Sequence, residues 1–272
     1  FDLDAAIIFS DILMVPYGLN QEVEFKKGIG PLLGNLNLDS ILKLEEIDFV
    51  EKLKPVYELV SMIKNNNLTK NKSTIGFVGA PWTLLVYMIN KKSPKDGLKN
   101  DFFKDNNLIH KILKIIEKFL KIHIKNQIDS GAQIIQIFDS WAGLLDEKDF
   151  TNYIYTPTTN LVDYIKSLNV PAICFPKGIK NYKKYCEIVK PSVISIDYEV
   201  NPKEILRDIK IPVQGGMDPK TLLTDQENLK KEVKKYLNIF KDHPYIFNLG
   251  HGILPETDPK MMDYLVKMVK DY

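Results

Sequence analysis

Seven short apolar runs in the sequence end in residues whose side chains could do chemistry. Carboxylates, hydroxyls, a lysine and an imidazole are among them, and such groups bind anions, transfer protons or cap helices. Because a polar residue after a strand often starts the next helix, each position is predicted to be either a site residue or a helix cap. The run ends are Ser10-Asp11, Ala80-Pro81-Trp82, Asp139-Ser140, Pro176-Lys177-Gly178, Asp197-Tyr198, Asp218-Pro219 and Gly250-His251-Gly252.

The apolar runs have little polar alternation, which is typical of parallel strands that are buried on both faces. Segments of helical periodicity separate them, with apolar residues at intervals of three and four. A further helix is expected after Pro81-Trp82. The runs cover residues 5–9, 75–79, 134–138, 172–175, 193–196, 211–214 and 245–249, and the helical segments cover 47–65, 108–130, 147–168, 181–189, 202–209, 225–240 and 259–272.

Regular alternation of strands and helices predicts an α/β fold with a parallel sheet. A doubly wound sheet usually carries a GxGxxG turn after its first strand, and this chain has none, so we favour a closed barrel. An open seven-stranded sheet is the competing interpretation. The length of 272 residues is typical of one α/β barrel, and we expect residues 1–272 to form a single domain.

The charge balance and the cysteines argue against several classes of function. The 37 basic and 35 acidic residues are spread along the chain, so we expect no nucleic-acid partner. No apolar stretch approaches the roughly 18 residues that a membrane span needs, so we expect no membrane partner. Cys174 and Cys186 have neither the spacing of a zinc site nor the number that a disulfide framework needs, which favours a cytoplasmic protein.

Five stretches of the sequence carry a resemblance that covers the chain from end to end. They are DAAIIFSDIL (4–13), GFVGAPWTLLVYM (76–88), GAQIIQIFDSWAG (131–143), VQGGMDP (213–219) and FNLGHGILPETDP (247–259). In their order and spacing they resemble the uroporphyrinogen decarboxylase family. The resemblance implies a (β/α)8 TIM barrel that removes carbon dioxide from the four acetate side chains of uroporphyrinogen III, giving coproporphyrinogen III for haem synthesis. It also implies that no cofactor or metal is used and that the protein is a homodimer.

The resemblance assigns roles to four residues at or just after the strand ends. Asp11 is implied to be the catalytic carboxylate, which accepts hydrogen bonds from the pyrrole N–H groups and stabilises the cationic protonated pyrrole. Tyr87, Ser140 and His251 are implied to bind the substrate. Lys177 is expected to contribute at most a positive charge at the rim of the site.

Each of these four residues also has a structural interpretation. Asp11 and Ser140 could cap the segments after their strands, and Tyr87 could be a core residue of its helix. A lone histidine is also more often structural than functional. The glycines that flank His251 favour a close approach of the backbone to a ligand.

A closed barrel has eight strands, whereas the sequence shows seven runs and enters the first almost directly after Phe1. The resemblance implies a preceding strand that ends in an Arg-Gln-Ala-Gly-Arg motif, so we expect this chain to lack the N-terminal strand and helix of its barrel. The two arginines of that motif would bind carboxylate side chains of the substrate, and one is a candidate for the general acid. Arg207, the single arginine here, lies on a predicted helix far along the chain. We therefore expect the polypeptide as written to be poorly soluble or inactive.

Two other functions stay open at the level of sequence. Zinc-dependent corrinoid methyltransferases and cobalamin-independent methionine synthase resemble this barrel, but they hold zinc with a His-x-Cys motif and a later cysteine. In this chain His251 is followed by Gly252-Ile253, and no cysteine follows Cys186. A tetrapyrrole-binding protein without catalysis is the second alternative.

Overall fold

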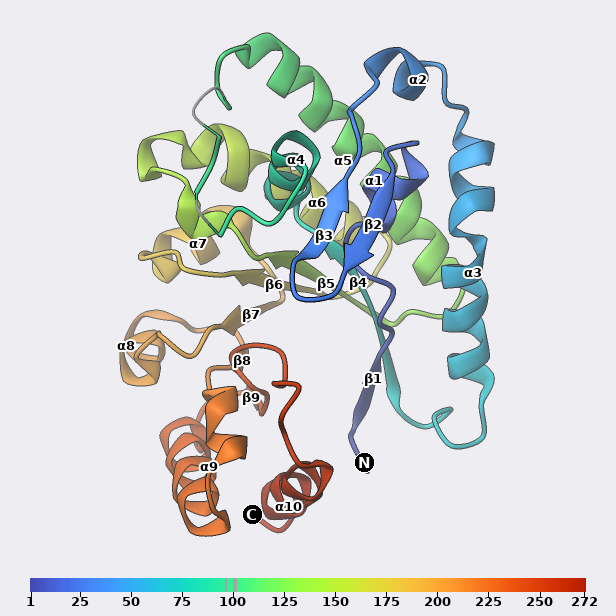
Figure 1. The fold of residues 1–272 in the computed structure, drawn as a ribbon. Coiled ribbons are helices and arrows are strands. Elements are labelled where there is room, and N and C mark those ends of the chain that lie inside the picture. The colour runs from blue at the N-terminus through green and yellow to red at the C-terminus, as the bar shows by residue number, and fades with distance from the viewer. Residues whose placement is uncertain (96, 100–101) are drawn as a thin grey trace.

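The computed structural model describes residues 1–95, 97–99 and 102–272. Its centre is a curled parallel sheet of seven strands in the order β1-β4-β5-β6-β7-β8-β9, with β1 and β9 at the two edges (Figure 1). All seven predicted runs lie on these strands, so the predicted parallel α/β sheet is confirmed. The strands are β1 (Ala5–Ile7), β4 (Ser73–Gly79), β5 (Ile134–Asp139), β6 (Ala172–Pro176), β7 (Val193–Ile196), β8 (Val213–Gly215) and β9 (Tyr245–Ile246).

Several strand ends differ from the predicted runs by one to three residues, among them the start of β8 and the end of β9. β8 begins at Val213 because Pro212 has no N–H to give to the ladder. β9 ends at Ile246, although Leu249 forms an isolated parallel bridge with Met217 further along. The backbone N–H of Gly250 donates to the Met217 carbonyl at 2.7 Å, so the segment after β9 still follows the end of β8.

Helices surround the outside of the sheet (Figure 1). Several begin at a side-chain cap: Asp105, Asn181, Asp225 and Asp258 each accept a bond from a backbone N–H in the first turn that follows. The helices are α3 (Glu46–Asn65), α4 (Pro81–Asn90), α5 (Asn106–Asp129), α6 (Thr156–Ser167), α7 (Tyr182–Val189), α8 (Pro202–Asp208), α9 (Gln226–Phe240) and α10 (Pro259–Lys270).

The helix predicted over residues 147–168 is not continuous. A 3₁₀ turn (Glu147–Asp149) and a π-helical turn (Thr151–Tyr155) precede α6. Pro157 stands in the first turn of α6 and has no N–H, so it cannot continue the hydrogen-bond ladder of a helix that arrives from residue 147.

Four short elements were not predicted from the sequence. An antiparallel hairpin of β2 (Val23–Lys26) and β3 (Gly30–Leu33) and two five-residue helices, α1 (Met14–Gly18) and α2 (Leu38–Leu42), lie between β1 and α3. None is long enough to show a hydrophobic period. The hairpin turns through Gly28 and Gly30, both with positive φ, a conformation that glycine adopts without steric cost.

The interior of the curled sheet positions the site. Phe138 and Phe175 meet edge to face on neighbouring strands, and Gln136, Ser195 and Gln214 are buried on the same inner face. No helix in the described part of the chain is long and apolar enough to cross a membrane.

Candidate active site

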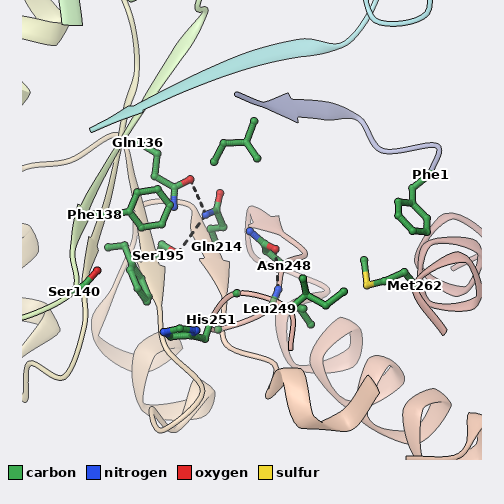
Figure 2. Close-up of a pocket in the computed structure, with 15 residues that line it drawn as sticks. Phe1, Gln136, Phe138, Ser140, Ser195, Gln214, Asn248, Leu249, His251 and Met262 are labelled. Carbon is green, nitrogen blue, oxygen red and sulfur yellow. Dashed lines mark hydrogen bonds between the residues drawn. The ribbon is translucent and has the colours of Figure 1, made fainter. Parts of the chain in front are cut away.

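A cavity of about 470 Å³ lies inside the curled sheet, and two of the four predicted site residues line it. Ser140 follows β5 and His251 follows β9, and Figure 2 shows both at the same end of the cavity. Asp11 and Tyr87 are not among the residues that line this cavity. The negative charge of Asp11 raises the pKa of the Tyr87 hydroxyl, so these two residues lie within electrostatic range of each other. The site therefore has two parts, which meet at the end of β5.

Polar residues of the cavity that the sequence reasoning missed include Gln136, Ser195, Gln214 and Asn248. The Gln214 side-chain amide donates to Gln136 Oε1 and to Ser195 Oγ, each at 3.3 Å, as drawn in Figure 2. Side chains of a strand alternate between its two faces, so Gln136, like Ser140 four residues later, points into the barrel. Counting back from Ser140 in steps of two residues along the strand could have identified Gln136 as an inward-facing side chain.

Asp11 lies in the loop between β1 and α1 with φ +67°, a left-handed conformation that aspartate tolerates better than most residues. Its Oδ1 accepts a hydrogen bond from the Leu13 N–H at 2.8 Å, which holds the turn ahead of α1, although α1 itself, whose N-cap residue is Leu13, has no side-chain cap. Burial raises the pKa of Asp11, and the Leu13 bond opposes the rise. Further donors would therefore favour the carboxylate form. The catalytic role of Asp11 stays a prediction.

Tyr87 lies in the second turn of α4 and is 9% exposed, so it is a core residue as well as a predicted site residue. Its ring meets Trp141 edge to face, with centroids 6.0 Å apart. Burial raises the pKa of the Tyr87 hydroxyl, the nearby Trp141 and Ser93 side chains lower it, and the Asp11 charge raises it. The tyrosine is therefore neutral and can donate a proton in a hydrogen bond.

His251 lies exposed at the rim of the cavity between Gly250 and Gly252. Partial burial of its ring lowers the pKa, and the positive charge of Lys177 lowers it further. The prediction that Lys177 contributes charge at the rim agrees with this interaction. Gly250 is needed for a contact within the protein and not for a ligand, because a Cβ there would lie 2.4 Å from the Tyr198 backbone nitrogen. A Cβ at Gly252 would meet nothing within 4 Å.

Asp139, the residue before Ser140, was named from the sequence at the end of its run but was given no role of its own. It is 1% exposed, and its Oδ1 accepts a hydrogen bond from Thr83 Oγ1 at 2.7 Å. Burial raises the pKa of the Asp139 carboxyl to about 7, although the Thr83 bond opposes the rise. In the described part of the chain Asp139 Oδ2 has no hydrogen-bond partner, and neither do Ser10 Oγ and Trp141 Nε1. Unpaired buried polar atoms thus occur beside both Asp11 and Ser140.

Among residues 1–95, 97–99 and 102–272, no three His, Cys, Asp or Glu side chains are grouped so that they could hold a metal ion. Cys174 and Cys186 are free thiols, and burial raises the pKa of each to about 12. Neither sulfur is poised to act as a thiolate.

Comparison with known families identifies a match over the whole chain. The family model described as Uroporphyrinogen decarboxylase (URO-D) matches residues 1–272. The uroporphyrinogen decarboxylase of Rickettsia bellii is 41% identical over 278 residues, which cover 100% of this chain and 82% of that protein. The enzyme of the same name from Rickettsia felis is 38% identical over 279 residues, covering 100% of this chain and 80% of the relative.

Solved structures with the same architecture include two proteins of distant sequence. A methyltransferase from Methanosarcina mazei superimposes with a TM-score of 0.78 at 16% identity, over 99% of this chain and 80% of the other. A B12-independent methionine synthase from Shewanella sp. W3-18-1 gives a TM-score of 0.52 at 16% identity, over 92% and 72% of the two chains. At this identity the similarity concerns the fold alone, and it agrees with the expected TIM-barrel class.

Proposed function

Because the chain belongs to the uroporphyrinogen decarboxylase family, we propose that it removes carbon dioxide from the four acetate side chains of uroporphyrinogen III to give coproporphyrinogen III. The observation that carries this proposal is the family match over residues 1–272. The site supports it, since a carboxylate, a tyrosine, a serine and a histidine lie at or just after the carboxyl ends of strands. In a TIM barrel that is where active sites are built.

Each decarboxylation protonates a pyrrole carbon, breaks the bond to the carboxylate and protonates the methylene that remains, after which the ring carbon gives up the proton it had gained. Carbon dioxide leaves, and a proton takes its place, so the acetate becomes a methyl group. The unstable species is the cationic protonated pyrrole. A fixed carboxylate near the ring stabilises this cation more than the neutral ground state, and that difference lowers the barrier.

Asp11 is the carboxylate that suits this task. Burial raises its pKa in the empty site, which disfavours the charge. The N–H groups of the pyrrole rings would donate to Asp11 and lower the pKa again, so that the bound substrate itself keeps Asp11 ionised. The Leu13 N–H bonds Oδ1, and within the part of the chain that the structure describes no donor to Asp11 Oδ2 is found, so Oδ2 can accept these bonds.

Tyr87, Ser140 and His251 would bind the carboxylate side chains of the substrate. The Tyr87 hydroxyl and the Ser140 hydroxyl are neutral donors. His251 presents an imidazole at the rim, close enough to Lys177 for the two to interact electrostatically. These contacts orient the macrocycle over Asp11 and require no cofactor.

A homodimer in the cytoplasm is part of the same proposal. The free thiols of Cys174 and Cys186 suit a reducing compartment. Analytical ultracentrifugation of the purified protein measures the mass in solution, and a mass of one chain at micromolar concentration would overturn the dimer.

The decisive experiment compares the protein, expressed from its complete gene, with its Asp11→Asn variant. Both are incubated without oxygen with uroporphyrinogen III, and the products are oxidised and separated by their number of carboxyl groups. Asparagine tolerates the left-handed backbone of residue 11 and can still accept the Leu13 bond, so this variant removes little besides the charge. We expect the wild-type protein to form the four-carboxyl product and Asp11→Asn to lose about 100-fold or more in turnover.

The matched control is Asp146→Asn, which changes an exposed aspartate in the turn after β5. It should turn over at the wild-type rate. Absence of coproporphyrinogen from the wild-type reaction would overturn the proposed activity, and a fast Asp11→Asn variant would overturn the role of Asp11.

A further inference from the structure

The end of β5 is held by the first turn of α4 through three hydrogen bonds. Thr83 Oγ1 donates to Asp139 Oδ1 at 2.7 Å and accepts from the Trp141 N–H at 3.1 Å. Trp82 Nε1 donates to the Trp141 carbonyl at 2.9 Å. An N–H can only donate, so the Thr83 hydroxyl must direct its own proton to Asp139. We call these four residues, Trp82, Thr83, Asp139 and Trp141, the clamp.

The clamp encloses Ser140. Side chains alternate along a strand, so Asp139 points to the helix layer while Ser140 points into the cavity. The clamp fixes Asp139, the residue before Ser140, through its side-chain carboxyl. It fixes Trp141, the residue after Ser140, through the backbone N–H and the backbone carbonyl. On the other side, the Lys177 N–H donates to the Asp139 carbonyl at 3.0 Å. The position of the Ser140 hydroxyl therefore follows from the clamp.

The same clamp controls Tyr87. This residue lies one turn after Thr83 on α4, and its ring packs edge to face on Trp141. A shift of Thr83 relative to Asp139 would move Tyr87 relative to Ser140. The two proposed binding residues come from different elements, and the clamp joins those elements at this end of the site.

The polar side chains of the clamp make the protein less stable than apolar side chains of the same size would. Trp82 and Thr83 are 0% exposed and Asp139 is 1% exposed, and a buried carboxyl with one hydrogen bond is unfavourable. The nearby titratable groups from the packed elements, Cys174 on β6 and Tyr185 on α7, both have raised pKa values and are neutral, so they neither repel the Asp139 carboxyl nor compensate its charge. An apolar side chain would fill the same space without this cost. What the polar pair adds is one fixed geometry.

We propose that Thr83 and Asp139 are positioning residues, which hold Ser140 and Tyr87 in the one arrangement that receives the carboxylate side chains of the substrate. This inference rests on the proposed function. A displacement of about 1 Å in such groups can cost a large factor in rate, so the loss of the clamp should be visible in the kinetics.

The test replaces Thr83 by valine, which has the same shape and no hydroxyl. Thr83→Val leaves Asp139 Oδ1 and the Trp141 N–H unpaired, and we expect KM for uroporphyrinogen III to rise about tenfold or more. Thr83→Ser keeps the hydroxyl and should return KM to within about threefold of the wild type. A purely structural role would lower the amount of active enzyme, and with it the apparent kcat, but would leave KM unchanged.

Thr74→Val is the matched control. Thr74 is 1% exposed on β4, and within the described residues its hydroxyl has no hydrogen-bond partner. It lies near the amino end of the strand, away from Ser140, so its loss should leave KM unchanged. If Thr83→Val does not fold, Trp82→Phe removes the Trp82 Nε1 donor while keeping an aromatic ring, and it should raise KM about threefold or more.

An activity-independent measurement separates this inference from the proposed function. The chain has two tryptophans, and both belong to the clamp: the Trp82 indole N–H donates in it, and the Trp141 indole is carried by a residue whose backbone it holds. The two indole N–H signals in an NMR spectrum therefore report on the clamp. We expect Thr83→Val to shift both signals and Thr74→Val to shift neither. A wild-type protein without decarboxylase activity would refute the proposed function. The NMR spectra would still test whether the clamp exists. A folded Thr83→Val or Trp82→Phe variant with wild-type KM, or a Thr83→Ser variant as impaired as Thr83→Val, would overturn the clamp.

Discussion

The charge state of single residues decides what the site can bind. Asp11 and Asp139 both have raised pKa values because they are buried, yet their surroundings differ. Asp11 faces a loop and accepts one backbone bond, so a ligand can add donors to it. Asp139 is enclosed between β5 and α4, and a ligand cannot reach it. The first is suited to chemistry and the second to positioning.

His251 offers a prediction at this scale. The positive charge of Lys177 lowers the pKa of the imidazole, after the larger effect of partial burial. Replacing Lys177 by methionine removes the charge and keeps the length of the side chain, so the pKa of His251 should rise. A titration of the histidine ring protons by NMR measures it. Lys180→Met, which changes an exposed lysine three residues away, should have no effect, and an unchanged His251 in Lys177→Met would contradict the prediction.

At the scale of elements, the loop after β9 depends on one close backbone contact. A Cβ on Gly250 would lie 2.4 Å from the Tyr198 nitrogen and 2.8 Å from the Asp197 carbonyl carbon. Both atoms belong to the backbone after β7, so they cannot move aside as a flexible side chain would. The glycine therefore allows the His251 loop to lie against the backbone that follows β7, two strands away in the sheet.

Gly250→Ala should lower the free energy of unfolding by about 1–3 kcal/mol, because the backbone of one of the two loops must shift. Gly252→Ala is the control in the same loop, and it should change stability by less than about 0.5 kcal/mol, since its Cβ meets nothing within 4 Å. Urea unfolding of the two variants provides the comparison. Equal stability of the two would show that the contact with Tyr198 is easily relaxed.

For the whole molecule, the two edges of the sheet are connected through charged side chains and not through a strand pair. Asp2, ahead of β1, forms an ion pair with Lys72 at 2.8 Å and another with Lys270 at the end of α10. Lys270 and then Lys72 lower the pKa of Asp2 to about 2. A depressed pKa means that these pairs contribute in full above the unfolded pKa near 4 and are lost as the pH falls through about 2.

Asp2→Asn should therefore loosen the end of α10 with little change in Tm, because exposed ion pairs contribute little to global stability. Hydrogen exchange at pH 7 should become faster in residues 259–270 of the variant, and 1 M salt should remove the difference by screening the pairs in the wild type. Asp146→Asn serves again as the exposed control. A wild-type exchange rate in Asp2→Asn would mean that other contacts hold α10 in place.

The sequence by itself determined the strand–helix order and the positions of the polar strand ends. Buried parallel strands such as Ile134–Asp139 and amphipathic helices such as Asn106–Asp129 have strong local patterns, so both were predicted within two residues of their observed ends. The resemblance to a known family then pointed to Asp11, Tyr87, Ser140 and His251, whose catalytic and binding roles stay predictions. The single-domain organisation stays a prediction as well.

Only the tertiary structure decided which of these residues meet. It placed Ser140 and His251 on one cavity and Asp11 beside Tyr87, and it revealed the bond between Thr83 and Asp139, which are 56 residues apart. It also showed that Gly250 is required by Tyr198 of the protein itself. Such contacts depend on how the strands curl and how α4 lies against β5. No periodicity along the chain records these relations, because they arise from packing between distant segments.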